Sequence, residues 1–141
     1  MKKIILIGRS EAGKTTLKQV LRGEAIAYAK TQSINYYDII VDTPGEYIQT
    51  KHLGGALAVY SYESDVIGLL ASATEPFSLF GPCIAATATR PVIGIVTKCD
   101  EKNAKVEMAY GWLKEAGCDP IFCVDSVTGR GISDILDYLN R

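Results

Sequence analysis

The chain has 141 residues, of which 48% are hydrophobic, and a formal net charge of −1 at pH 7. This length and composition predict a single globular domain over residues 1–141, and the near-neutral charge gives no reason to expect nucleic-acid binding, which normally needs a basic face. The uncharged stretches are too short for a transmembrane helix and the N-terminal apolar run is too short for a signal peptide, so we expect a cytoplasmic protein without a membrane partner.

Short apolar runs recur along the chain and predict five buried strands, at residues 3–8, 38–42, 66–71, 91–97 and 120–125. Their hydrophobicity is continuous rather than alternating, which is typical of parallel strands covered on both faces. Apolar residues at helical spacing follow within 106–116, before Gly117, and within 132–139. The pattern predicts an α/β fold with a three-layer, doubly wound, mostly parallel sheet.

The stretch GRSEAGKT, residues 8–15, stands between the first predicted strand and a helical pattern. It fits G-x-x-x-x-G-K-[ST], with Gly8, Gly13, Lys14 and Thr15 in the specified places. In such a loop the backbone N–H groups and the lysine face phosphate oxygens, and the hydroxyl binds Mg²⁺. The motif alone also fits an ordinary turn between a strand and a helix.

The second strand ends in DTPG, which puts Asp42 directly after the apolar run and Gly45 three residues later. In the D-x-x-G pattern the carboxylate supports Mg²⁺ through water, and the glycine N–H meets a terminal phosphate. The alternative is an acidic residue that ends a strand in a Pro-Gly turn.

The fourth strand ends in TKCD, where the Asp100 carboxylate can accept hydrogen bonds from N1–H and the 2-amino group of guanine. Adenine lacks this pair of donors, and the stem of Lys98 can pack over a base. The alternative for Asp100 is the capped start of a helix. Ser126 follows the last strand, where backbone N–H groups can meet a base oxygen. Polar motifs at four strand ends together predict a nucleotide site.

The order GRSEAGKT, DTPG, TKCD, DSVTG resembles that of the Ras-like, translation-factor-related P-loop GTPases over essentially the whole chain. More narrowly, DTPGEY, PVIGIVTK and the small size resemble the ethanolamine-utilisation P and propanediol-utilisation V family. That family is associated with bacterial microcompartments, and its members are described as GTPase-like and as ATP-binding. The resemblance implies a P-loop NTPase fold of the small-GTPase type, with GTP or GDP and Mg²⁺ as cofactors and ATP as the alternative. It also implies a microcompartment shell or regulatory protein as partner.

The resemblance assigns roles to individual positions. The implied phosphate and base contacts are Gly8, Arg9, Ser10, Glu11, Ala12, Gly13, Lys14, Thr15, Thr16, Gly45, Thr97, Lys98, Asp100, Ser126 and Val127. The implied magnesium ligands are Thr15, Asp42 and, as the first-switch threonine, Thr31, with Ser33 as the runner-up. The implied catalytic residues are Lys14 and Glu46.

Two acidic residues depart from the usual pattern. Glu46 stands where Ras-type enzymes have a water-orienting glutamine, and Glu11 stands where many bacterial relatives have asparagine. Negative charges near a polyphosphate weaken its binding or demand cations unless they point away.

Three functions stay open: a slow GTP-hydrolysing switch, a phosphotransferase that passes the terminal phosphoryl group of ATP to a small carboxylate such as acetate, and a nucleotide-bound scaffold without chemistry.

Overall fold

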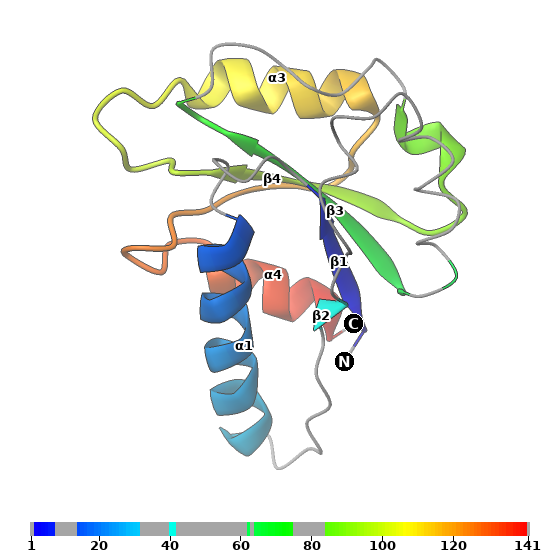
Figure 1. Cartoon of the computed structure of the whole chain (residues 1–141), viewed down its shortest axis with the longest axis vertical. Coiled ribbons are helices and arrows are strands. Elements are labelled where there is room, and N and C mark those ends of the chain that lie inside the picture. The colour runs from blue at the N-terminus through cyan, green and yellow to red at the C-terminus, as the bar shows by residue number, and fades with distance from the viewer. Residues whose placement is uncertain are drawn as a thin grey trace.

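The computed structural model of the protein describes residues 2–7, 14–31, 40–41, 62, 64–74 and 84–140. Within these residues five strands form one sheet (Figure 1): β1 (Ile4–Ile7), β2 (Ile40–Val41), β3 (Val66–Ser72), β4 (Val92–Thr97) and β5 (Ile121–Cys123). The helices described are α1 (Lys14–Thr31), the short 3₁₀ helix η3 (Ile84–Thr87), α3 (Val106–Ala116) and α4 (Ile132–Leu139).

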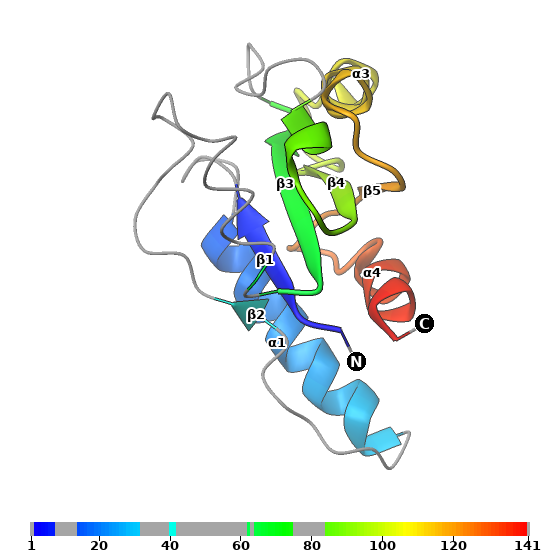
Figure 2. The ribbon, with the colours of Figure 1, turned by 90° about the vertical axis from the view of Figure 1, so that its right-hand side faces the viewer.

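The strands lie in the order β2-β1-β3-β4-β5, and each pairing between them is parallel. Helices α1 and α4 cover one face of the sheet and α3 covers the other (Figure 1), and Figure 2 shows the strand order from the side. The chain runs outward from β1 in both directions, so the sheet is doubly wound and the switch point lies between β1 and β3. This confirms the predicted fold class, and each predicted strand is found at its apolar run, with β3 extending one residue further, to Ser72.

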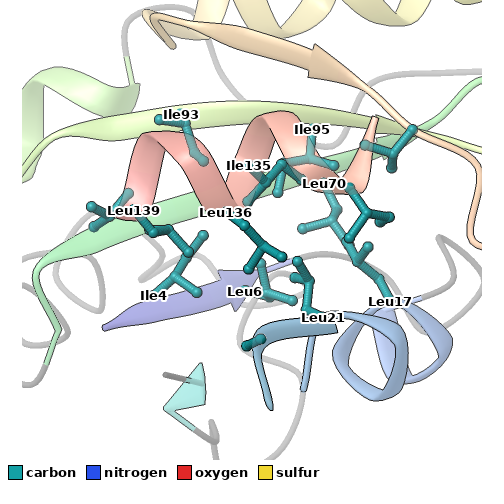
Figure 3. Packing of buried hydrophobic residues seen from close by; sticks show 14 residues of the cluster. Ile4, Leu6, Leu17, Leu21, Leu70, Ile93, Ile95, Ile135, Leu136 and Leu139 are labelled. Atoms are coloured by element: carbon teal, nitrogen blue, oxygen red, sulfur yellow. The ribbon is translucent and has the colours of Figure 1, made fainter. Parts of the chain in front are cut away.

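The continuous hydrophobicity of the strands is explained by two separate cores, one on each face. In β1, for example, Ile4 and Leu6 belong to the core under α1 and α4, while Ile5 and Ile7 belong to the core under α3. Figure 3 shows the first of these cores, in which strand residues meet Leu17 and Leu21 of α1 and the apolar face of α4. A strand buried on both sides needs apolar residues at every position, which is what the sequence shows.

The helical patterns read from the sequence correspond to buried faces. Helix α3 buries Ala109, Leu113 and Ala116, and it ends at Gly117, whose φ of 97° is left-handed. Helix α4 buries its predicted residues, Ile132, Ile135, Leu136 and Leu139. None of the helices in the described ranges combines the length and the apolar character that crossing a membrane requires.

Two glycines shape the loop between β5 and α4. Gly129 and Gly131 each have a φ of 81°, a backbone conformation that costs an L-residue with a Cβ about 1–2 kcal/mol. Their surroundings differ. A Cβ at Gly131 would collide with the carbonyl oxygen of Cys123, the last residue of β5, whereas a Cβ at Gly129 would meet no atom within 4 Å.

This difference predicts unequal effects for two matched substitutions. Gly129→Ala should lower the free energy of unfolding by about 1–2 kcal/mol, the cost of the backbone conformation alone. Gly131→Ala should lower it by about 1–3 kcal/mol more, because the loop must move away from the β5 carbonyl. Urea unfolding of both variants measures the difference. An equal loss in the two would contradict the close approach of this loop to β5.

Candidate functional site

A pocket of about 120 Å³ lies at the carboxyl ends of β4 and β5, beside the first turn of α1. Residues from three distant parts of the chain line it: Thr16, Thr97, Lys98, Glu101, Asp125, Ser126 and Val127. Five of these seven residues were predicted from the sequence as nucleotide contacts, and the other two are Glu101 and Asp125. The pocket therefore gathers the start of a helix and the ends of two strands, which is where open α/β sheets bind their ligands.

The turn after β4 forms one wall of the pocket. Thr97 ends the strand and is buried, and Lys98 has a φ of 59°, a left-handed conformation that is sparsely populated by residues other than glycine. The turn is closed by a hydrogen bond from the Glu101 N–H to the Lys98 carbonyl, 3.1 Å long. Such backbone outliers cost about 1–3 kcal/mol and cluster at functional sites, where neighbouring structure maintains them.

Asp125, two residues after the end of β5, connects the two loops that meet at the pocket. Its side chain is almost fully buried, and its Oδ1 accepts hydrogen bonds from the N–H groups of Val127 (2.9 Å) and Thr128 (3.2 Å). Its Oδ2 accepts a bond of 3.2 Å from the N–H of Asp100 in the loop after β4. One carboxylate thus sets the position of one loop relative to the other.

Asp100, the residue predicted to bind the guanine base, forms hydrogen bonds with two side chains of the same protein. Its Oδ1 lies 2.6 Å from Nη1 of Arg130, and its Oδ2 accepts a hydrogen bond of 3.1 Å from the Thr128 hydroxyl. The hydrogen bond from Arg130 holds the pKa of the Asp100 carboxyl below its usual value, and the same bond raises the pKa of Arg130. At neutral pH both groups are charged.

Two cysteines, Cys99 in the turn after β4 and Cys118 just after α3, are buried and have thiols that stay protonated. Burial raises the pKa of the Cys99 thiol to about 12, and Cys99 donates a hydrogen bond of 3.2 Å to the Val96 carbonyl. Burial also raises the pKa of Cys118 to about 12. Both thiols stay protonated at neutral pH, so neither serves there as a nucleophile or a thiolate metal ligand.

The phosphate and switch motifs lie largely outside the described residues. Lys14 is the first residue of α1, and Thr15 and Thr16 follow in the first turn with exposed side chains. The predicted residues that fall outside the described ranges are Gly8, Arg9, Ser10, Glu11, Ala12, Gly13, Ser33, Asp42, Gly45 and Glu46.

The structure does not bring Thr31 to the other predicted magnesium ligand on the same helix. Thr31 is the last residue of α1, and its hydroxyl donates a hydrogen bond of 3.0 Å to the Ala27 carbonyl. Thr15 lies in the first turn, about 24 Å away along the axis at 1.5 Å per residue. One ion cannot bind both side chains in this arrangement, because the helix runs without interruption from Thr15 to Thr31.

Sequence reasoning missed three residues that organise the site. Asp125 opens DSVTG, and an aspartate followed by small residues and glycine is typical of a side-chain-bonded turn, so this signal was available. Thr128 and Arg130 gave no comparable signal, because they lie 28 and 30 residues from Asp100 in the chain and meet it only where two loops approach each other.

Comparison with solved structures supports the architecture. Translation elongation factor SelB from Methanococcus maripaludis, in its apo form, superimposes with a TM-score of 0.65 at 19% identity, over 99% of this chain and 33% of that chain. The present chain thus corresponds to about a third of that factor. Together with the sheet order and the position of the pocket, this likeness defines the fold as that of a P-loop NTPase.

Within that class the family is also shown. The chain belongs to the ethanolamine utilisation–propanediol utilisation (PduV-EutP) family, whose pattern it matches over residues 1–141. It is 40% identical to the propanediol utilization protein PduV of Citrobacter freundii, over 99% of this chain and 94% of that protein. It is 30% identical to the probable acetate kinase EutP of Escherichia coli strain K12, over 99% and 89% respectively.

The ion pair of Asp100 predicts a titration. By NMR, the pKa of the Asp100 carboxyl should lie below the ordinary aspartate value of about 3.9 and should rise toward it in Arg130→Gln. The pair is complete at neutral pH and is lost as the pH falls through the lowered pKa, because protonation removes the charge that Arg130 holds. An Asp100 pKa that is the same in both proteins would contradict the pair.

Proposed function

We propose that the chain is a small guanine-nucleotide-binding protein that hydrolyses GTP slowly and acts as a switch in propanediol or ethanolamine utilisation. The observation that carries the proposal is the pocket lined by Thr16, Thr97, Lys98, Ser126 and Val127, since these residues come from the motifs that predict phosphate and base contacts. We further propose that the protein works in the cytoplasm, with a microcompartment shell or regulatory protein as its partner.

The phosphate end of the site is proposed at the start of α1. The helix begins with Lys14, and its first turn contains no acidic residue. Helix N-termini present unpaired N–H groups and a positive dipole end, which stabilise phosphate. With Gly8 to Gly13 as the loop before it, Lys14 supplies the charge that meets the outer phosphates.

A magnesium ion is proposed beside the same helix turn. The hydroxyl of Thr15 is exposed in the first turn of α1, and hydroxyl and carboxylate oxygens are the donors that Mg²⁺ accepts. Asp42 of DTPG is the second proposed residue, acting through water. When bound, the ion neutralises charge on the phosphates.

The base end of the site is proposed at the two loops that Asp125 joins. Thr97 and the stem of Lys98 line the pocket where the base plane is proposed to lie, and the backbone at Ser126 can meet a base oxygen, whereas the Val127 N–H is held by Asp125. Asp100 then accepts the two donors of guanine that adenine lacks. GTP is therefore favoured over ATP.

Hydrolysis is proposed to be slow because Glu46 replaces the glutamine of Ras-type enzymes. Its carboxylate, next to Gly45 in the sequence, can orient or deprotonate the attacking water. Lys14 stabilises charge on the oxygens of the transferred phosphoryl group. Nothing in the sequence marks an arginine as the finger that fast enzymes use, so acceleration is expected from a partner.

One observation favours a second function. The relatives that share 30% and 31% identity with this chain over nearly its whole length are named probable acetate kinases. In that reaction a carboxylate oxygen of acetate attacks the terminal phosphorus of ATP, the bond to the β-phosphate oxygen breaks, and acetyl phosphate and ADP form. Trapping acetyl phosphate with hydroxylamine, in the presence of ATP, Mg²⁺ and acetate, tests this alternative.

The phosphate end predicts the effect of Lys14→Ala. Loss of one desolvated charged contact should weaken GTP binding by about 2–4 kcal/mol, as measured by isothermal titration with Mg²⁺. Lys30→Ala is the matched control, because Lys30 is exposed in the last turn of the same helix and should leave the affinity unchanged. Wild-type affinity in Lys14→Ala would rule out the phosphate loop.

The proposed chemistry predicts the rate of a single turnover. Without a partner, GTP hydrolysis should proceed at about 10⁻⁴–10⁻² s⁻¹, the range of P-loop GTPases without a finger in trans. Glu46→Ala should lower this rate and leave the affinity for GTP unchanged. A rate near ~10 s⁻¹, typical of kinases, would contradict a slow switch. An unchanged rate in the variant would remove Glu46 from the mechanism.

A further inference from the structure

Both oxygens of the Asp100 carboxylate are already bound within the chain. Arg130 reaches Oδ1 at 2.6 Å, a short distance that is typical of a charge-assisted hydrogen bond, and Thr128 donates to Oδ2 at 3.1 Å. A guanine that binds Asp100 presents one donor to each of these oxygens. The base and the two side chains therefore require the same acceptor.

The carboxylate also lies off the pocket wall. Lys98 and Glu101, which stand on either side of Asp100 in the sequence, line the pocket. Asp100 is not among the described residues that line it. Its contacts are with Thr128 and Arg130 in the loop after β5. In this arrangement the side chain that separates guanine from adenine is held beside the pocket and not in it.

The contact can open without disturbing the fold. The Arg130 side chain is 59% exposed and that of Asp100 is 33% exposed, so the pair is screened by solvent and is weak. The loop itself is held by other bonds. Asp125 binds its N–H groups, and the Asp125 N–H donates to the Arg130 carbonyl at 3.0 Å, a bond that does not involve the Arg130 side chain.

We propose that Arg130 is a positioning residue that competes with guanine for the Asp100 carboxylate and thereby lowers the preference of this protein for GTP over ATP. The inference rests on the proposed nucleotide site and adds to it an internal competitor. In this competition a guanine nucleotide weakens or replaces the Arg130 hydrogen bond when it engages Oδ1 of Asp100. An adenine nucleotide has no donor pair for the carboxylate and leaves the ion pair in place.

The test is the ratio of GTP to ATP affinity, because the phosphate contribution cancels in it. Titrations with Mg²⁺ should show that Arg130→Gln raises GTP affinity by about two- to fivefold, the strength of an exposed ion pair, and leaves ATP affinity unchanged. Arg130→Lys retains the charge and should stay closer to the wild type. Lys102→Gln, which removes an exposed charge from the same loop as Asp100, is the matched control and should not change the ratio.

Salt gives a readout that a merely structural role would not produce. The wild-type GTP-to-ATP ratio should rise with ionic strength as the ion pair is screened, and the ratio of Arg130→Gln should stay flat. An unchanged or lower ratio in Arg130→Gln, with GTP still bound by the wild type, would overturn the competition and leave the proposed function standing. A wild-type protein that binds neither nucleotide would overturn both.

Discussion

The buried carboxylate of Asp125 holds together the loops that follow β4 and β5, and the geometry of the candidate site depends on it. It accepts hydrogen bonds from the N–H groups of Val127 and Thr128 in its own loop and from the N–H group of Asp100 in the other loop. A buried charge is stable only when its hydrogen bonds are made, so the two loops cannot separate without leaving it unsatisfied. The surface residues Asp100 and Arg130 pair with each other beside this buried carboxylate.

The rigidity of that edge comes from the sheet beneath it. Two apolar cores, one against α3 and one against α1 and α4, hold the strands from both faces. The ends of β4 and β5 and the start of α1 are thereby held together, and Thr16 and Lys98 both line the pocket between them. The buried apolar residues lie in the two cores, while the candidate site lies on short loops at the carboxyl edge of the sheet.

Much of this arrangement could be predicted from the sequence, and the exceptions have physical causes. Uninterrupted apolar runs identified the buried strands, and the motifs at their ends identified Thr97, Lys98 and Ser126, because parallel strands bring their carboxyl ends to one edge. Thr31 was assigned to a metal site as the first-switch threonine that the resemblance implies, but helix α1 continues to that residue. The Asp100–Arg130 contact could not be read from the sequence, since it depends on how two loops approach one another.

The central claim is that this edge of the sheet binds a guanine nucleotide. Isothermal titration of the wild-type chain with GTP, GDP and ATP, each with Mg²⁺, tests it most directly, with Asp100→Ala as the comparison. The account predicts saturable binding of GTP and GDP, a preference for GTP over ATP of at least about 10²-fold, and loss of that preference in Asp100→Ala. Equal affinities of the wild type for GTP and ATP, or a preference that survives in Asp100→Ala, would contradict it.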